Sequence, residues 1–107
     1  FRYSEPTIGY KAVIFCNGEL EEGQLSNLLN YLDVKFDNIE ISKEENKIQQ
    51  EEGDEIISNL AVDFDFFIYN ENELERIIED IRDGLNREFN VELLEFHIKQ
   101  LPRLKKQ

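Results

Sequence analysis

The chain has 107 residues, with 24 acidic and 12 basic side chains and a formal net charge of −12 at neutral pH. This length fits one domain, and 40% hydrophobic residues with eight Phe and four Tyr are typical of a packed globular protein. No apolar run approaches the roughly 18 residues that a membrane span needs, so we expect a soluble protein without a membrane partner. Nucleic-acid binding requires a cationic footprint, and the acidic balance therefore argues against direct nucleic-acid binding.

A single cysteine, Cys16, allows no internal disulfide, and its apolar surroundings in the sequence are typical of a buried thiol. The chain begins at Phe1 and contains no Met, which indicates a trimmed product that would have lost any upstream targeting segment. We expect a cytoplasmic protein.

The first part of the chain predicts an arm, a strand, a helix and a second strand. Residues 1–9 show no periodicity and predict a lead-in arm. Residues 10–16 are β-branched and aromatic and predict a strand that ends at the turn signal of residues 17–18. A helix is indicated next, with leucines expected on one face, which are Leu20, Leu25, Leu28, Leu29 and Leu32; the spacing of the last four is helical. Residues 34–41 predict a strand with a bulge or a bend, because the apolar alternation slips at Asp37 and Asn38.

Residues 42–59 are poor in apolar side chains and predict a long solvated β-hairpin or loop. From position 40 to position 55 the chain carries seven acids and two lysines. The acids that we expect to steer a partner are Glu44, Glu45, Glu51, Glu52, Asp54 and Glu55.

The second part of the chain predicts a strand, a helix and a last strand. Residues 60–68 alternate without a break, and the polar face of this strand continues to Tyr69. A helix capped by Asn70 or Asn72 is expected to end at Asn90. Residues 91–99 predict a strand whose buried side chains are Leu94, Phe96 and Ile98. Residues 100–107 form a short basic tail.

This order of elements predicts one α+β domain over residues 1–107. We expect a split βαβ, ferredoxin-like two-layer sandwich, with a four-stranded, antiparallel-containing sheet and both helices on one face. The acidic hairpin or loop of residues 42–59 is inserted between the two halves. The alternative is an α+β meander in which residues 42–59 contribute an additional hairpin.

The sheet face away from the helices is more apolar than a solvated face requires. The first strand is apolar on both sides, and Phe67, Tyr69 and Leu93 add to this open face. We therefore expect another segment or molecule to pack against this face: the N-terminal arm, a second copy of the chain or another protein.

Chemistry-bearing residues are few. Asp63 and Asp65 project from the same face of one strand and could together bind Mg²⁺, but a third acid and a phosphate-binding loop are not evident. A divalent-metal enzyme is therefore the least favoured alternative. His97 is the only histidine; we expect it on an exposed strand face, where a pair with Asp65 or Cys16 would depend on strand order. We predict no enzyme, no catalytic residue, no metal site and no cofactor.

The leading hypothesis is a non-enzymatic, acidic protein-binding domain that docks on a basic protein surface. It would act as an inhibitor or adaptor, for example by masking a nucleic-acid-binding surface. The loop acids named above would steer the encounter, and Phe67 and Tyr69 would anchor it. The alternative is a self-associating structural or regulatory domain, a homodimer through the open sheet face, in which the acidity only keeps the protein in solution.

Overall fold

The computed structural model describes residues 8–102 of the chain. The elements follow in the order β1 (Ile8–Asn17), α1 (Glu22–Tyr31), β2 (Lys35–Ser42), β3 (Asn46–Gln49), β4 (Glu55–Ser58), β5 (Leu60–Ile68), the short 3₁₀ helix η1 (Glu71–Glu73), α2 (Leu74–Phe89) and β6 (Glu92–Gln100). Residues 8 and 9, expected in the arm, already belong to β1, and Gln100 belongs to β6. The rest of the predicted arm (1–7) and most of the predicted tail (103–107) lie outside the described residues.

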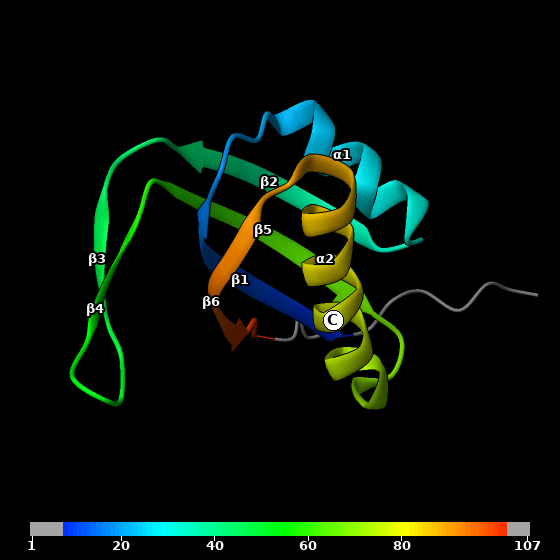
Figure 1. The fold of residues 1–107 in the computed structure, drawn as a ribbon. Coiled ribbons are helices and arrows are strands. Elements are labelled where there is room, and N and C mark those ends of the chain that lie inside the picture. The colour runs from blue at the N-terminus through cyan, green and yellow to red at the C-terminus, as the bar shows by residue number, and fades with distance from the viewer. Residues whose placement is uncertain (1–7, 103–107) are drawn as a thin grey trace, which may run out of the picture.

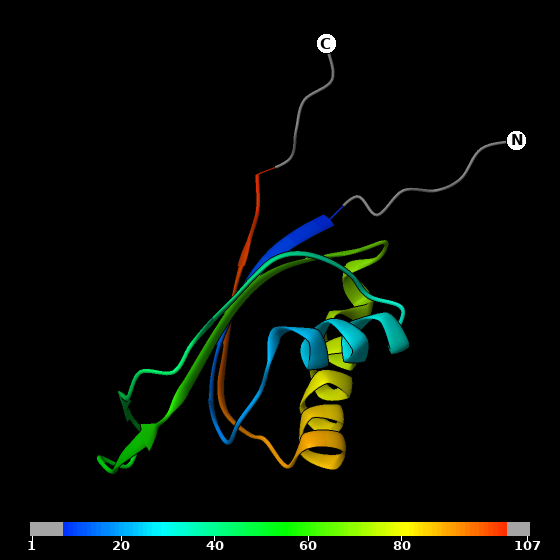
Figure 2. The same cartoon turned by 90° about the horizontal axis from the view of Figure 1, so that it is seen from above.

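The protein has an α+β fold built on a four-stranded sheet. Its strand order is β2-β5-β1-β6, and every neighbouring pair is antiparallel. Both helices pack against one face of this sheet, and no helix of residues 8–102 covers the opposite face, called here the open face (Figures 1 and 2). β1 and β2, which α1 connects, do not touch each other, because β5 lies between them.

The core lies between the helices and the two central strands. Alternate residues of β1 and β5 point toward the helices and are buried, which are Ile8, Tyr10, Ala12, Ile14, Cys16, Leu60, Val62, Phe64, Phe66 and Ile68. The two helices cross closely where Leu28 of α1 meets Gly84 of α2. A Cβ at Gly84 would lie 2.6 Å from Leu28 Cδ1, so any larger residue here would force the Leu28 side chain to shift.

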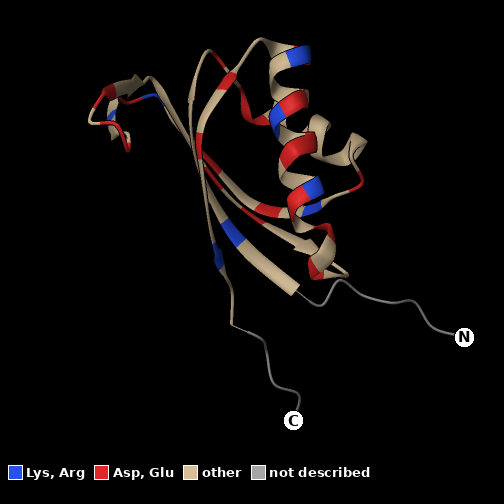
Figure 3. Ribbon diagram, turned by 60° about the horizontal axis from the view of Figure 1, so that its bottom comes forward, with Lys and Arg blue, Asp and Glu red and all other residues tan. Residues whose placement is uncertain are grey.

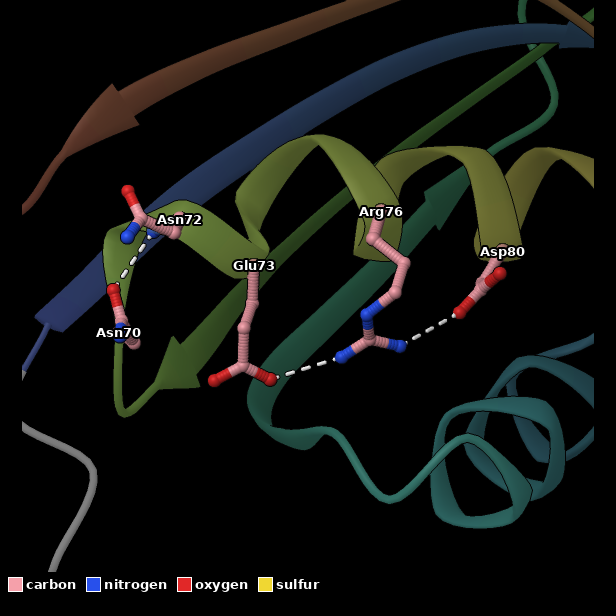
Figure 4. Close-up of polar contacts among 5 residues, drawn as sticks. All are labelled: Asn70, Asn72, Glu73, Arg76 and Asp80. Atoms are coloured by element: carbon pink, nitrogen blue, oxygen red, sulfur yellow. Dashed lines mark hydrogen bonds and ion pairs between the residues drawn. The ribbon is translucent and has the colours of Figure 1, made fainter.

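The predicted ends of the second helix, at Asn70 and Asn90, are confirmed, whereas Leu20, which the sequence placed on the first helix, precedes α1. Gln24 Oε1 accepts the backbone N–H of Glu21 at 2.9 Å before α1. At the start of η1, Asn70 Oδ1 accepts the N–H of Asn72 at 3.0 Å (Figure 4). Asn90 ends α2 in the left-handed conformation, with φ 56°. These side chains and this turn satisfy backbone groups that a helix end leaves unpaired.

Two strands carry a bulge, of which the sequence predicted one. The register of β2 against β5 shifts between Asp37 and Glu40, as the slipped alternation indicated. The register of β6 against β1 also shifts, so that Leu93 pairs with Cys16 and packs against the core. The predictions that Leu93 faces the open side and that Leu94 packs in the core were therefore wrong, because the bulge at Leu94 reverses the side-chain phase.

Residues between β2 and β5 form a second, two-stranded sheet. β3 and β4 pair antiparallel, with Ile48 opposite Ile56. The hairpin projects beyond the end of the main sheet, away from the two helices (Figures 1 and 2).

Candidate functional site

The acidic side chains that sequence patterning singled out lie on the β3–β4 hairpin. Two precede β3, three lie in the turn and one begins β4; all are exposed, and they are Glu44, Glu45, Glu51, Glu52, Asp54 and Glu55. The turn closes through hydrogen bonds from Gln50 N–H to Asp54 O and from Gly53 N–H to Gln50 O. Gly53 has φ 89°, which favours glycine. Acidic residues are concentrated at this turn (Figure 3).

The base of the hairpin is fixed to the end of β1. The hydroxyl of Ser58 is buried and lies 2.9 Å from Cys16 O and 2.8 Å from Leu60 O, so it can donate to either carbonyl. The N–H of Asn59 donates to Asn17 Oδ1, and the N–H of Gly18 donates to Asn59 Oδ1. These contacts hold the acids at a defined distance from the sheet.

Two lysines, Lys43 and the exposed Lys47 of β3, offset only part of the charge of these six acids. Lys43 lies at the root of the hairpin and pairs with Glu21, with Nζ 3.0 Å from Oε2. On α2, by contrast, each arginine contacts acids of the same helix region. Arg76 lies 2.9 Å from Glu73 and 3.0 Å from Asp80 (Figure 4), and Arg82 and Arg87 pair with Glu79 and Glu88. The hairpin is thus more strongly negative than α2.

The two aromatic residues predicted as anchors lie at the other end of β5. Tyr69 is 53% exposed. Phe67 is half-buried on the open face, where its ring lies over Gly9 beside Leu101. The hairpin enters β5 at Leu60, so the nine residues of this strand place the aromatics about 25 Å from the hairpin's base. The predicted partner-binding residues therefore form two separate groups rather than one surface.

Asp63 and Asp65 share the open face, as predicted, and each faces another acid across the strand pair. Asp63 is opposite Glu40, and Asp65 is opposite Asp37. The amide of Asn38 donates to Asp65 Oδ2 at 2.9 Å. Within residues 8–102, no group of three or more His, Cys, Asp or Glu side chains is placed to hold a metal ion.

His97 and Cys16 lie on opposite faces of the sheet. His97 is exposed on the open face, with Nε2 2.7 Å from Glu95 Oε1, and its ring meets that of Phe15 edge-on at 5.9 Å. Cys16 faces the core, where burial raises the pKa of its thiol to about 12. The sheet therefore separates this thiol from the imidazole, and the histidine's partner is Glu95.

Sequence reasoning missed a groove between the two helices. It is lined by Leu28 and Tyr31 of α1 and by Arg87 and Phe89 of α2, among others. Tyr31 is 82% exposed there. The sequence signal that could have indicated this groove is Tyr31, a tyrosine in the last turn of a helix whose other large apolar residues are leucines.

No protein-family model, curated protein sequence or solved structure matches this chain. Neither α1 nor α2 within the described part of the chain is long and apolar enough to cross a membrane.

Proposed function

We propose that this chain is a non-enzymatic protein-binding domain that docks through its acidic β3–β4 hairpin on a basic protein surface. The observation that supports this most directly is the projecting hairpin, which carries six exposed acids and is anchored at its base by a buried serine. Fixed charges of one sign accelerate association with an oppositely charged surface. A hairpin that stands clear of the helices could enter a basic channel without moving the core.

The domain is proposed to act as an inhibitor or adaptor, for example by covering a surface that binds nucleic acid. Such surfaces are rich in Lys and Arg because they neutralise phosphates. We further infer that the scaffold is ferredoxin-like. The strand order β2-β5-β1-β6 and the placement of both helices on one face support that assignment. In this reading the acidic hairpin is an insertion between the two βαβ halves.

The proposal is tested by affinity capture from host lysate at about 50 and about 500 mM salt, with proteins identified by mass spectrometry. Three baits are compared: the unmodified chain, a hairpin variant with Glu51, Glu52 and Asp54 changed to Lys, and a control variant with Glu71, Asp83 and Glu92 changed to Lys. Both variants have the same net charge. We expect a basic protein that the unmodified chain and the control retain at low salt.

The hairpin variant is expected to lose that protein. Equal capture by the hairpin variant and the control would contradict a role for the hairpin, because the two differ only in where the charge was reversed.

A further inference from the structure

β6 is an edge strand of the four-stranded sheet, paired with β1 on one side only among the described residues. The N–H of Leu101 donates to Gly9 O at 2.8 Å, in line with the β1–β6 ladder. Because inward and outward backbone groups alternate along an antiparallel strand, the N–H and C=O groups of Phe96, Ile98 and Gln100 point away from β1. This edge can accept another strand.

The side chains along this edge match those of a second copy of the same strand that runs in the opposite direction. The run from Glu95 to Lys99 reads acid, apolar, histidine, apolar, base. We propose that β6 pairs antiparallel with β6 of a second copy of this chain, with the two-fold axis at His97. A closed two-fold contact uses the same strand twice, and the two sheets would become one continuous eight-stranded sheet.

Within the run Glu95–Lys99, every pair in this register is favourable or apolar, apart from the two histidines on the axis. Glu95 lies opposite Lys99 of the second copy, and the two-fold repeats this pair. Phe96 lies opposite Ile98 in the same way on the helix-facing side. The charged pairs fall at non-hydrogen-bonded positions, where side chains of antiparallel strands approach most closely. An axis at Phe96 or Ile98 would lose both Glu–Lys pairs.

The solvent exposure of Ile98 on this edge fits a position that another strand can occupy. Ile98 is opposite the fully buried Ala12, yet it is 37% exposed, and no strand among residues 8–102 lies on its outer side. The other edge strand, β2, is interrupted by its bulge, where Asn38 has φ 55°. Bulges protect edges from pairing. The bulge of β6 lies at Leu94, outside the regular run Glu95–Gln100, so β6 offers the longer regular edge.

The hairpin adds to the charge complementarity. Glu95 and the hairpin residues Gln49–Glu52 line one hollow. In the proposed register, Lys99 of the second copy would approach Glu95 beside this hollow, near the carboxylates of Glu51 and Glu52. The open sheet face is less suited to a second copy, because Asp37, Asp65, Glu40 and Asp63 would bring many carboxylates into the contact.

The test is sedimentation equilibrium of the full chain at about 150 mM salt, up to about 0.5 mM protein. We expect a reversible dimer with twice the 12.7 kDa chain mass. Glu95→Lys and Lys99→Glu each turn two attractive pairs into repulsive ones and should raise the dissociation constant about tenfold. Lys35→Glu changes the net charge as Lys99→Glu does, but on the opposite edge strand β2, and should leave the dissociation constant within about threefold.

The double variant Glu95→Lys/Lys99→Glu restores opposite charges and should return the dissociation constant to the unmodified value. An equimolar mixture of the two single variants should form a heterodimer. A monomer at all concentrations would overturn the proposal. A dimer that both single variants leave unchanged, or that the double variant fails to restore, would equally overturn pairing through β6.

Discussion

At the scale of single residues, burial decides which polar groups can react. Cys16 lies at the end of β1 with its side chain fully buried among the core residues. Desolvation disfavours the thiolate and raises the pKa of the thiol from 9.0 to about 12. The thiolate is the nucleophile in cysteine chemistry, so the folded protein holds this group in its unreactive form.

We therefore expect native protein to react with a thiol reagent at neutral pH only as fast as it unfolds, and denatured protein to react at once. Because the pKa is raised on folding, its contribution to stability is complete below pH 9 and is lost as the pH rises toward about 12. Cys16→Ala removes this part of the pH dependence. Native protein that is modified as quickly as denatured protein would contradict the assignment.

Ser58 is the residue on which the position of the hairpin depends most. Its hydroxyl lies among the carbonyls of Cys16 and Leu60 and also accepts the N–H of Leu60 at 3.3 Å. All three contacts lie in the interior, where unpaired backbone groups are costly.

Ser58→Ala is expected to lower the free energy of unfolding by about 1–3 kcal/mol in chemical denaturation. Hydrogen exchange in β3 and β4 should rise at the same time. Ser42→Ala, on β2, is the matched control and should cost less than about 0.5 kcal/mol. If the two substitutions behave alike, Ser58 does not anchor the hairpin.

At the scale of elements, the spacing of apolar residues along the chain predicted the type and position of the regular strands and helices. The alternation of residues 60–68 and the leucine spacing before residue 33 correspond to β5 and α1. The bulge of β6 could not be read in the same way. Leu93 and Leu94 are adjacent and both apolar, so either phase fits the sequence, and only pairing with Cys16 selects Leu93 for the core.

In the candidate site, too, features set by the local sequence could be predicted, and features set by long-range strand pairing could not. The acids of the hairpin could be predicted because charge density is a property of the local sequence. The separation of Phe67 and Tyr69 from that hairpin depends on the direction of β5, which follows from the sheet's long-range pairing. The Glu95–His97 contact follows from the alternation of β6, which places both side chains on the same face of the sheet.

At the scale of the whole molecule, charge is unevenly distributed. The described body is elongated, with extents of 51 × 27 × 22 Å, and the hairpin projects at one end (Figure 2). Lys and Arg on α2 are interleaved with acids, whereas the hairpin turn is acidic (Figure 3). A net charge of −12 with such a projection suits an encounter in which the hairpin meets a basic surface first.

The most direct test of this account is the association rate with the captured basic protein, measured by stopped flow from about 50 to about 500 mM salt. For the unmodified chain, and for the control with Glu71, Asp83 and Glu92 changed to Lys, we predict a rate that falls about tenfold over this range. For the variant with Glu51, Glu52 and Asp54 changed to Lys, we predict a slower rate that hardly depends on salt. Equal rates and equal salt dependence for all three proteins would contradict docking through the hairpin.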